Sequence, residues 1–279
     1  MVQDQETPSV LHASPLGKRI DQSSKACDAD VLFAVPREQQ RAQLGLAGKL
    51  PFWGEDVWNA FELSWLDPVG KPIVALAELR FPHDSSFLVE SKSLKLYLNS
   101  FYNARFDSSR AVAQAIARDL AKVCGATVKV RLVLAGRAAR DTSFGRCIDG
   151  LPVACAHYMP CPSLLRTLPE QAREVLCSHL LRSRCPVTNQ PDWGSVRVDY
   201  EGPRIDPAGL LQYVVSFRDH QGFHEQCVEH MFLDISRHCK PSFLLVQARY
   251  TRRGGLDINP YRTTDPTRPA PANSRLFRQ

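Results

Sequence analysis

The residues from Cys185 to Trp193 combine a thiol with a carboxylate in a stretch that two prolines interrupt. The stretch reads Cys-Pro-Val-Thr-Asn-Gln-Pro-Asp-Trp, so Asp192 lies seven positions after Cys185. Prolines restrict the backbone, and loops held by regular elements often display reactive groups. Cys185 is therefore a candidate nucleophile. The alternative is an inert thiol, because Cys185 is one of nine cysteines and most cysteines behave as small buried residues.

Residues 90–95 and the pair His224 and Glu225 carry groups suited to binding anions and moving protons. The first segment, Glu-Ser-Lys-Ser-Leu-Lys, places cations at the expected start of a helix, where exposed N–H groups attract phosphates. A well-capped helix with a solvated charged face is the alternative. Glu225 could accept two N–H donors of a planar heterocycle while His224 relays protons. Alternatively, Glu225 is a first-turn acid that meets the helix dipole, beside a surface histidine.

The run RYTRRGGLDINPYR, residues 249–262, places two arginines next to two glycines. The guanidinium fork matches phosphate oxygens, and glycines let a backbone approach a phosphate closely. A basic run with aromatic residues is also typical of nucleic-acid contacts, which is the main competing interpretation. The sequence contains no GxGxxG motif, so it gives no indication of a Rossmann dinucleotide site.

A metal site is not expected from the sequence. His224, Cys227 and His230 fall within about two helical turns, but no CxxC spacing supports them as ligands. We expect Cys227 to be a core residue. The nine cysteines are irregularly spaced, so free thiols are expected rather than a disulfide framework.

The composition is that of a globular protein. The chain has 279 residues, 44% of them hydrophobic and 23% charged, which predicts one large domain or, more in keeping with this length, two. No apolar run is long enough to span a membrane, and the first residues lack a signal-peptide pattern, so a cytoplasmic protein is expected. The net charge of +6 suits a phosphorylated ligand as well as a nucleic acid.

Hydrophobic periodicity predicts the elements that must position these groups. Strands are expected over 58–66, 73–81, 126–135, 195–200 and 243–249, and helices over 90–106, 108–124, 207–217 and from 223 onward. Residues 107–109 offer an N-cap for the second helix and Gly125 ends it, whereas Asp206 and Pro207 form a favoured helix start. Residues 171–182 are compatible with either a helix or a strand.

The order of elements repeats in the second half of the chain. Leu94, Tyr97, Ser100 and Phe101 recur 116 positions later as Leu210, Tyr213, Ser216 and Phe217. The apolar members are expected to be core in both copies, so the repeat is architectural. At the same offset Cys185 falls on Val69, and residues 90–93 fall on 206–209, an ordinary helix start. A site assembled from both halves explains this asymmetry, although two unrelated loops would produce it too.

Four motifs together resemble a known family. ESKSLKLYLNSF, CPVTNQPDWGSV, FHEQCVEH and YTRRGGLDINPYR, in that order and spacing, resemble the long, two-lobed form of the NADPH-dependent 7-cyano-7-deazaguanine reductases, the nitrile reductases of queuosine biosynthesis. The resemblance covers roughly residues 16–279. It implies an α+β fold of two tandem tunnelling-fold (T-fold) units, each an antiparallel sheet with two helices on one face in the order ββααββ.

The resemblance also implies how the chain is divided and how it assembles. Residues 1–45 would form an N-terminal arm, 46–160 the first unit and 161–279 the second, and residues 171–182 would be a strand. T-fold sites lie at interfaces between units, so a homodimer at least is implied. The substrate would be the free base 7-cyano-7-deazaguanine, so no direct nucleic-acid binding and no membrane association are implied.

The chemistry implied by the resemblance uses the groups singled out above. Cys185 would add to the nitrile carbon as a thiolate and form a thioimide, and Asp192 would deliver a proton. His224 would relay protons near the substrate. Taking a nitrile to an amine needs two hydrides, hence two NADPH per turnover, and water must be kept from the imine between them.

Binding roles follow from the same resemblance. The substrate contacts implied are Val89, Glu90, Ser91, His224 and Glu225, with Glu225 anchoring the edge of the base. The NADPH contacts implied are Ser91, Lys92, Arg253 and Gly254, whose cations suit the 2′-phosphate.

Two alternatives stay open at this point. One is a T-fold enzyme that processes purines or pterins without a redox cofactor, which relies on metal or on different acid–base residues. The other is an RNA-binding module, suggested by the net positive charge and the arginines of 249–262.

Overall fold

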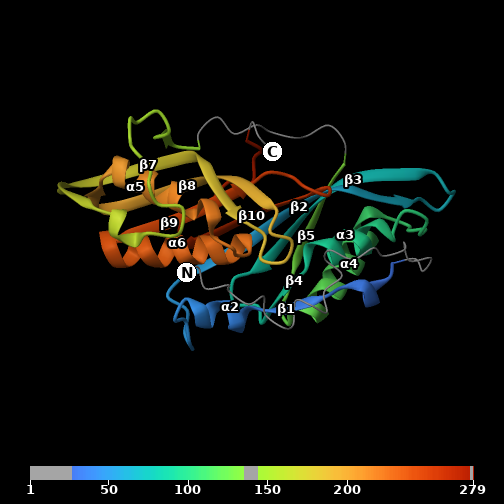
Figure 1. Ribbon diagram of the computed structural model, residues 1–279. Coiled ribbons are helices and arrows are strands. Elements are labelled where there is room, and N and C mark those ends of the chain that lie inside the picture. The colour runs from blue at the N-terminus through green and yellow to red at the C-terminus, as the bar shows by residue number, and fades with distance from the viewer. Residues whose placement is uncertain (1–26, 135–143, 277–278) are drawn as a thin grey trace.

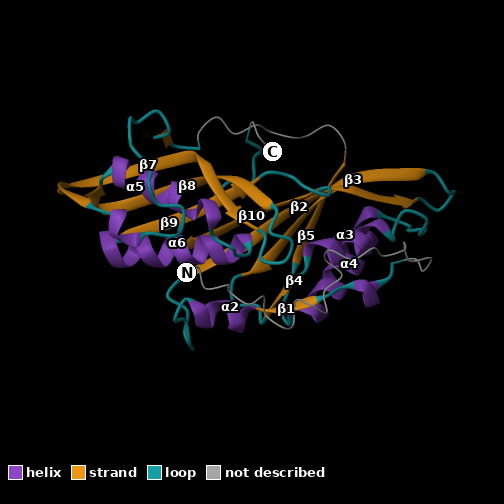
Figure 2. Cartoon of the chain, viewed as in Figure 1, coloured by secondary structure: helices purple, strands orange, loops and turns teal. Residues whose placement is uncertain are grey.

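The described residues of the computed structural model are 27–134, 144–276 and 279, and they build one continuous sheet. The strand order is β5-β3-β2-β10-β9-β8-β7-β6, and a separate two-stranded sheet pairs β1 with β4. Helices α3 and α4 lie beside the strands of the first half, and α5 and α6 beside those of the second half (Figures 1 and 2). This mixed architecture of antiparallel strands and few helices confirms the predicted α+β class.

The first half follows the predicted order. Its elements are β2 (Trp53–Leu66), β3 (Pro72–Pro82), β4 (Phe87–Val89), α3 (Ser91–Asn99), α4 (Ser109–Cys124) and β5 (Lys129–Leu134). The turn between β2 and β3 forms because the carboxylate of Asp67 accepts the N–H groups of Val69 and Lys71 at 3.0 and 2.8 Å. Ser108 caps α4, and Gly125 ends it in the left-handed region.

The second half confirms the predicted pattern and resolves residues 171–182 as strand. Its elements are β7 (Thr167–Arg184), β8 (Pro191–Ile205), α5 (Pro207–Ser216), α6 (His224–Cys239), β9 (Phe243–Tyr250) and β10 (Leu256–Thr263). Asp206 caps α5 by accepting the N–H of Ala208 at 3.1 Å, and Pro207 occupies the first turn. The only part of residues 185–193 outside β7 and β8 is the loop 185–190.

Matching contacts in the two halves show that the repeat is structural. Tyr97 donates to Asp119 at 2.8 Å, and Tyr213 donates to Asp234 at 2.7 Å. Each tyrosine also packs edge-on against the phenylalanine four residues later, with ring centroids 5.2 and 5.4 Å apart. All six apolar residues of the sequence repeat are buried, so the expectation that they are core is confirmed.

β10 joins the two halves. It pairs antiparallel with β2 on one side, from Leu256 opposite Ala60 to Thr263 opposite Trp53, and with β9 on the other. Residues 249–262 form a basic run without a strand period in the sequence, so periodicity does not predict this strand. Its side chains are buried throughout, which removes the alternation that marks a strand with one solvated face.

The segments that precede each half are short. In the first, residues 27–45 contain η1 (Ala29–Val31), β1 (Ala34–Pro36) and α2 (Arg37–Gln43), while the rest of the predicted arm lies outside the described residues. β1 pairs with β4, which brings the start of α2 next to residues 86–87, where the N–H of Arg37 donates to the carbonyl of Ser86 at 3.1 Å. Between the halves, β6 (Arg146–Cys147) pairs in parallel with β7, followed by η2 (Pro162–Leu164); η3 (Phe217–Asp219) follows α5.

No helix of the described ranges is both long and apolar enough to cross a membrane.

Candidate active site

Cys185 is held at the end of β7 by backbone pairing on two sides. Its N–H donates to the carbonyl of Gln190 at 2.9 Å, and its carbonyl accepts the N–H of Asn189 at 3.0 Å, which closes the loop 185–190. The preceding residue, Arg184, exchanges hydrogen bonds of 2.8 and 3.1 Å with His220 and Gly222, in the segment that leads into α6. The side chain is 2% exposed, so the thiol faces an interior pocket rather than open solvent.

This inner pocket collects most of the predicted catalytic and substrate residues. It encloses about 430 Å³ of empty space, part of it open to solvent. The predicted residues that line it are Val89, Ser91, Cys185, Asp192, His224, Glu225 and Arg253; its other walls include Val35, Trp58, Leu88, Phe223 and Ile258. Residues from β1, β2, the start of α3, the 185–190 loop, α6 and β10 therefore converge on one cavity.

Asp192, at the start of β8, lies between the guanidinium of Arg253 and the imidazole of His224. Its Oδ1 is 2.9 Å from the guanidinium of Arg253, and its Oδ2 is 3.2 Å from Nε2 of His224. Burial raises the pKa of Asp192, but the imidazole of His224 and the guanidinium of Arg253 lower it more, so the pKa lies below its usual value. Asp192 is therefore a carboxylate at neutral pH in the ligand-free protein.

His224 begins α6 and stacks against Tyr250 of β9. The two rings are 3.8 Å apart between centroids and inclined by 16°. Neither ring nitrogen makes a well-aligned hydrogen bond within the part of the chain that the structure describes, although Nε2 lies within ion-pair distance of Asp192. The stacking fixes the plane of the imidazole and leaves its nitrogens able to serve a ligand in the pocket.

Glu225 follows His224 and is 2% exposed. Its Oε1 is buried without a hydrogen-bond partner among the described residues. Burial and the nearby charge of Asp56 raise the pKa of Glu225, although His224 and Arg37 partly offset this. A buried carboxylate oxygen with no donor is costly in the empty protein, and a ligand with N–H groups would remove that cost.

A second, outer hollow adjoins the inner pocket. It shares Ser91, His224, Arg253 and Ile258 with the inner pocket, and its space is about 820 Å³, part of it open to solvent. Lys92, Lys95, Thr188, Gln190, Thr251, Gly254 and Leu256 complete its lining. Three cationic side chains and several neutral donors around one hollow are suited to an anionic ligand.

The glycines beside Arg253 have a conformational role. Arg253 and Leu256 exchange hydrogen bonds of 2.9 and 3.1 Å, and the two residues between them, Gly254 and Gly255, have φ of 58° and 78°. Two positive φ values are what a two-residue hairpin turn of type I′ requires. This turn between β9 and β10 lies next to Lys95 of α3, so it closes the outer hollow against the first half.

Glu90 caps α3 rather than lining either hollow. Its carboxylate accepts the N–H groups of Lys92 and Ser93 at 2.7 and 2.8 Å. The well-capped helix is therefore the correct interpretation of the backbone here, because these two N–H groups are already used. The cations of the segment still line the outer hollow, and the predicted substrate contact of Glu90 stays a prediction.

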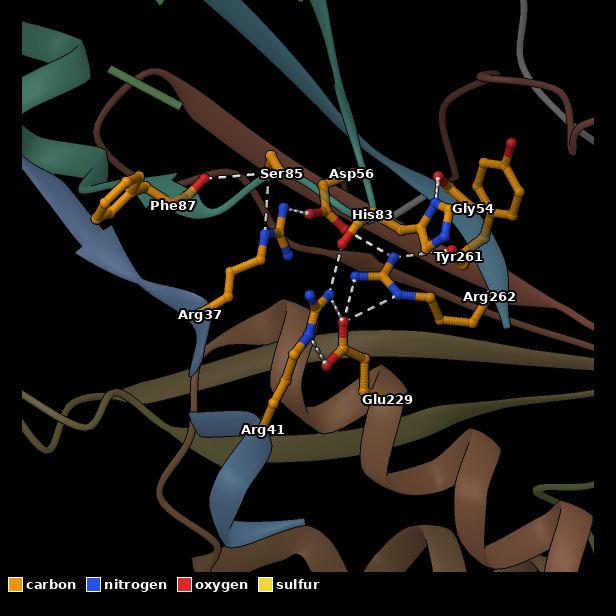
Figure 3. Close-up of polar contacts among 10 residues, drawn as sticks. All are labelled: Arg37, Arg41, Gly54, Asp56, His83, Ser85, Phe87, Glu229, Tyr261 and Arg262. Atoms are coloured by element: carbon orange, nitrogen blue, oxygen red, sulfur yellow. Dashed lines mark hydrogen bonds and ion pairs between the residues drawn. The ribbon is translucent and has the colours of Figure 1, made fainter. Parts of the chain in front are cut away.

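A buried ion network connects α2 to both halves (Figure 3), and the charges of its Asp56 and Arg37 act on Glu225. Asp56 of β2 accepts from Arg37 of α2 at 2.5 Å and from Arg262 of β10 at 2.8 Å. Glu229 of α6 accepts from Arg41 of α2 at 2.7 Å and from Arg262 at 2.9 Å. Figure 3 shows the three guanidinium groups turned toward the two carboxylates, and each guanidinium is paired with at least one carboxylate.

Several pocket residues could not be singled out from the sequence. Trp58 and Ile258 form part of the inner wall because they face each other in the β2–β10 register. Tyr250 fixes His224 from β9. The sequence pattern places Trp58 in a predicted strand and Tyr250 in a basic run. Nothing in the neighbouring sequence indicates which partner strand either residue meets. Cys227, expected to be core, is confirmed as a fully buried member of the second-half cluster.

Comparison with known proteins gives a family for this arrangement. Residues 24–132 match the family described as "Nitrile reductase, 7-cyano-7-deazaguanine-reductase N-term", and residues 191–268 match "QueF-like protein". A solved structure, the archaeosine synthase QueF-Like in the apo form, covers 34% of this chain and 94% of its own with a TM-score of 0.30 and 18% identity, a likeness too low to bear on the fold.

Curated relatives match nearly the whole chain. An NADPH-dependent 7-cyano-7-deazaguanine reductase of Azoarcus sp. is 55% identical over 267 residues, which is 93% of this chain and 95% of the relative. Those of Burkholderia multivorans and Chromohalobacter salexigens are 52% and 51% identical over 95% and 98% of this chain, and over 98% and 99% of their own lengths. The chain belongs to the family of NADPH-dependent 7-cyano-7-deazaguanine reductases.

Proposed function

We propose that this protein reduces the nitrile of 7-cyano-7-deazaguanine to the primary amine 7-aminomethyl-7-deazaguanine with NADPH, in queuosine biosynthesis. Membership of the family supports the reaction. The observation that carries the mechanism is the inner pocket, in which a buried thiol, an ionised carboxylate, an imidazole and an unpartnered carboxylate oxygen line one cavity. The cation-lined outer hollow adjoins it.

Glu225 would bind the base. A deazaguanine presents adjacent N–H groups on one edge, and the buried Oε1 of Glu225 lacks a donor within the described ranges. Val89 and Ser91 line the same pocket, and Glu90 fixes the backbone between them by capping α3. The apolar walls Trp58 and Ile258 suit the faces of a flat heterocycle.

Cys185 would attack the nitrile carbon. As the sulfur–carbon bond forms and one π bond of the C≡N group breaks, the nitrogen needs a proton and the thiol must lose one. Asp192 is ionised in the ligand-free protein, so it can first accept the thiol proton and then give it to the nitrogen. The product of this step is a thioimide, and the net charge of the site does not change.

The residues around the outer hollow fit NADPH. Lys92, Lys95 and Arg253 supply positive charge for phosphates, and Ser91, Thr188 and Thr251 supply hydroxyl groups. Bound there, NADPH supplies hydride to carbon, and two such deliveries complete the reduction. The protein's own part is to hold the substrate at Cys185, to provide protons through Asp192 and His224, and to keep water from the imine.

We further propose that the two halves are tandem T-fold units and that the chain acts as a homodimer. The paired Tyr–Asp contacts and the common element order support the duplication. Cys185, Asp192 and His224 come from the second half, whereas Ser91 and Lys92 come from the first. Neither half alone would hold a complete site.

Mass spectrometry of the protein mixed with 7-cyano-7-deazaguanine tests this proposal. Without NADPH we expect the mass of the protein to increase by the mass of the base, through a covalent bond at Cys185. With NADPH we expect two NADPH molecules to be oxidised for each amine formed. Cys185→Ala should form no adduct. Cys161→Ala is the matched control, because that thiol lies in a loop of the same half outside both hollows.

An adduct that persists in Cys185→Ala, or its absence from the unmodified protein, would contradict the thioimide mechanism. The two alternatives make different predictions. A T-fold enzyme without a redox cofactor would oxidise no NADPH, and an RNA-binding module would show a salt-dependent affinity for RNA in place of an adduct.

A further inference from the structure

A second group of reactive side chains lies away from both hollows, where β6 meets β7. Ligand atoms of Cys147, Cys177 and His179 all lie within 4.8 Å of one another. Cys147 is exposed, Cys177 is buried and His179 is half-buried, so the cluster reaches from the surface into the protein. All nine cysteines of the chain are free thiols in the structure. None of the three side chains lines the inner pocket or the outer hollow.

The backbone fixes this cluster in place. Cys147 and Cys177 are direct partners in the parallel β6–β7 register. The N–H of Ile148 donates to the carbonyl of Cys177 at 2.9 Å, and the N–H of His179 donates to Oδ2 of Asp149 at 2.9 Å. The two segments are thus tied together before and after the thiols, which limits how far the thiols can separate.

His179 is oriented by a neighbour in the way metal-binding histidines are. Its Nδ1 lies 2.8 Å from the hydroxyl oxygen of Ser195 on the adjacent strand β8. A hydrogen bond at one ring nitrogen fixes the orientation of the ring, as is usual for metal-binding histidines. Cys177 donates weakly to the carbonyl of Gly145 at 3.4 Å, a bond that a metal ion would replace.

We propose that Cys147, Cys177 and His179 bind one Zn²⁺ ion. Two thiolates and an imidazole are soft and borderline donors, which favour Zn²⁺ over Mg²⁺ or Ca²⁺. Cys147 is exposed, so a water molecule can take the fourth tetrahedral position. Binding displaces one proton from each thiol to solvent, so the two thiolates neutralise the charge of the ion.

The ion would have a structural role. β6 has only two residues, Arg146 and Cys147, and it follows the segment that leads from the first half to the second. Coordination would fasten this short strand to the long strand β7 at the edge of the sheet. The proposal replaces the sequence-based expectation of no metal, which considered only His224, Cys227 and His230. It is independent of the reductase mechanism, because none of its ligands belongs to that site.

Cobalt titration of the reduced, chelator-treated full chain tests the site. We expect one Co²⁺ per chain, with thiolate-to-metal charge transfer and the visible bands of a tetrahedral site, and stoichiometric displacement by Zn²⁺. Cys147→Ser should weaken binding by about 100-fold or more and abolish the charge-transfer band of that thiolate. Since Cys147 is exposed, this variant is expected to fold. Cys155→Ser, a half-buried thiol of the same region, is the control and should bind as the unmodified chain does.

Zn²⁺ should also raise the thermal unfolding midpoint of the unmodified chain and leave that of Cys147→Ser unchanged. Three results would overturn the proposal. They are weak, unsaturable cobalt binding without tetrahedral bands, equal binding by Cys147→Ser and the unmodified chain, and a Cys147–Cys177 disulfide in protein kept under reducing conditions.

Discussion

Arg253 links the two hollows through a single contact with Asp192. The guanidinium is 39% exposed, lines both hollows and lies 2.9 Å from Oδ1 of the carboxylate. A phosphate in the outer hollow would compete with Asp192 for the same cation. The protonation of Asp192 is therefore expected to depend on what occupies the outer hollow.

Arg253→Ala should raise the pKa of Asp192, because it removes one of the two side chains that lower this pKa. If Asp192 must be ionised to accept the thiol proton, adduct formation at Cys185 is lost as pH falls through this pKa. The acid limb of the rate–pH profile should then move to higher pH in the variant. Adduct formation followed by mass spectrometry, without NADPH, measures this limb.

Arg252→Ala is the matched control for that measurement. The guanidinium of Arg252 lies over the ring of Phe61, 4.8 Å from its centroid, and lines neither hollow. Its acid limb should coincide with that of the unmodified protein. If the acid limb of Arg253→Ala also coincides with that of the unmodified protein, Arg253 does not influence Asp192 during the reaction.

Glu225→Gln should weaken binding of the base. The amide keeps the shape of the side chain but places an N–H₂ donor where the base presents its own donors, which leaves buried donors unpaired at about 1–3 kcal/mol each. We expect affinity, measured by calorimetry with Cys185→Ala as background, to fall by about tenfold or more. Exposed Glu170→Gln should leave it unchanged. Equal affinity in the Glu225 variant would place the edge of the base elsewhere.

At the residue scale, the sequence identified the polar groups better than the walls. Cys185, Asp192, His224 and Glu225 could be predicted to share one pocket, because their types are chemically distinctive and their motifs resemble those of a family. Trp58 could not, because its role depends on pairing between β2 and β10, which are about two hundred residues apart in the chain.

Among the elements, α2 depends on the ion network most directly. α2 has few apolar side chains to bury. It is held instead by its buried residues Arg37 and Arg41, which pair with Asp56 and Glu229. Removing one partner from a buried ion pair leaves an uncompensated charge, which is much more costly than losing a surface pair. The position of α2, and hence of β1 beside the inner pocket, should follow the state of this network.

Glu229→Gln should lower the free energy of unfolding by about 3 to 5 kcal/mol, because Arg41 and Arg262 each lose a charged partner. Urea unfolding followed by circular dichroism measures this change. Lys129→Ala is the control, since its pair with Glu55 is largely solvent-exposed and should contribute little. A change no larger than that of the control would mean that the network is not stabilising.

The same network predicts the direction of acid sensitivity. Burial raises the pKa of Glu229, but Arg262 and Arg41 lower it more, so its folded pKa lies below the unfolded value. Its contribution to stability is fully present above the unfolded pKa and is lost as pH falls through the folded pKa. Glu229→Gln should therefore reduce the dependence of unfolding on pH in this acid range.

Gly54→Ala should disrupt the pairing of β2 with β10. A Cβ at Gly54 would lie 2.0 Å from the carbonyl oxygen of Tyr261, which neither strand can accommodate without moving. We expect a large loss of thermal stability together with loss of activity. Gly150→Ala is the matched control, because a Cβ there meets nothing within 4 Å. Similar unfolding midpoints for both variants would show that β10 can shift without penalty.

At the element scale, local signals predicted most helices and strands. Ser108, Gly125 and Asp206 fix helix ends through contacts within a few residues, so the sequence alone indicates them. Periodicity does not predict β10 or α2, because both are held by residues far away in the chain. β10 is buried and has a neighbouring strand on each side, so its sequence does not alternate between apolar and polar residues. α2 is short and buries arginines, so its sequence has no apolar stripe.

For the whole molecule, the two edges of the sheet are the candidate surfaces for assembly. β5 has one neighbour, β3, among the described strands, and β7 is covered by β6 over only two residues. Unpaired strand edges are sites of association. Light scattering should give the molar mass of a dimer or of a multiple of the dimer. Activity should be lost at protein concentrations low enough for the dimer to dissociate into monomers. A fully active monomer would contradict the proposed assembly.

The joining of the halves by β10 also has a consequence for synthesis. Domains tend to fold from the N-terminus as the chain is made. β2 emerges from the ribosome early, but its partner β10 is the last of the described strands to do so. The edge of β2 therefore waits unpaired through most of translation, and Ser91 and Cys185 can come to line one pocket only near its end. A released chain that ends before residue 256 should hold both half-sheets but no substrate pocket.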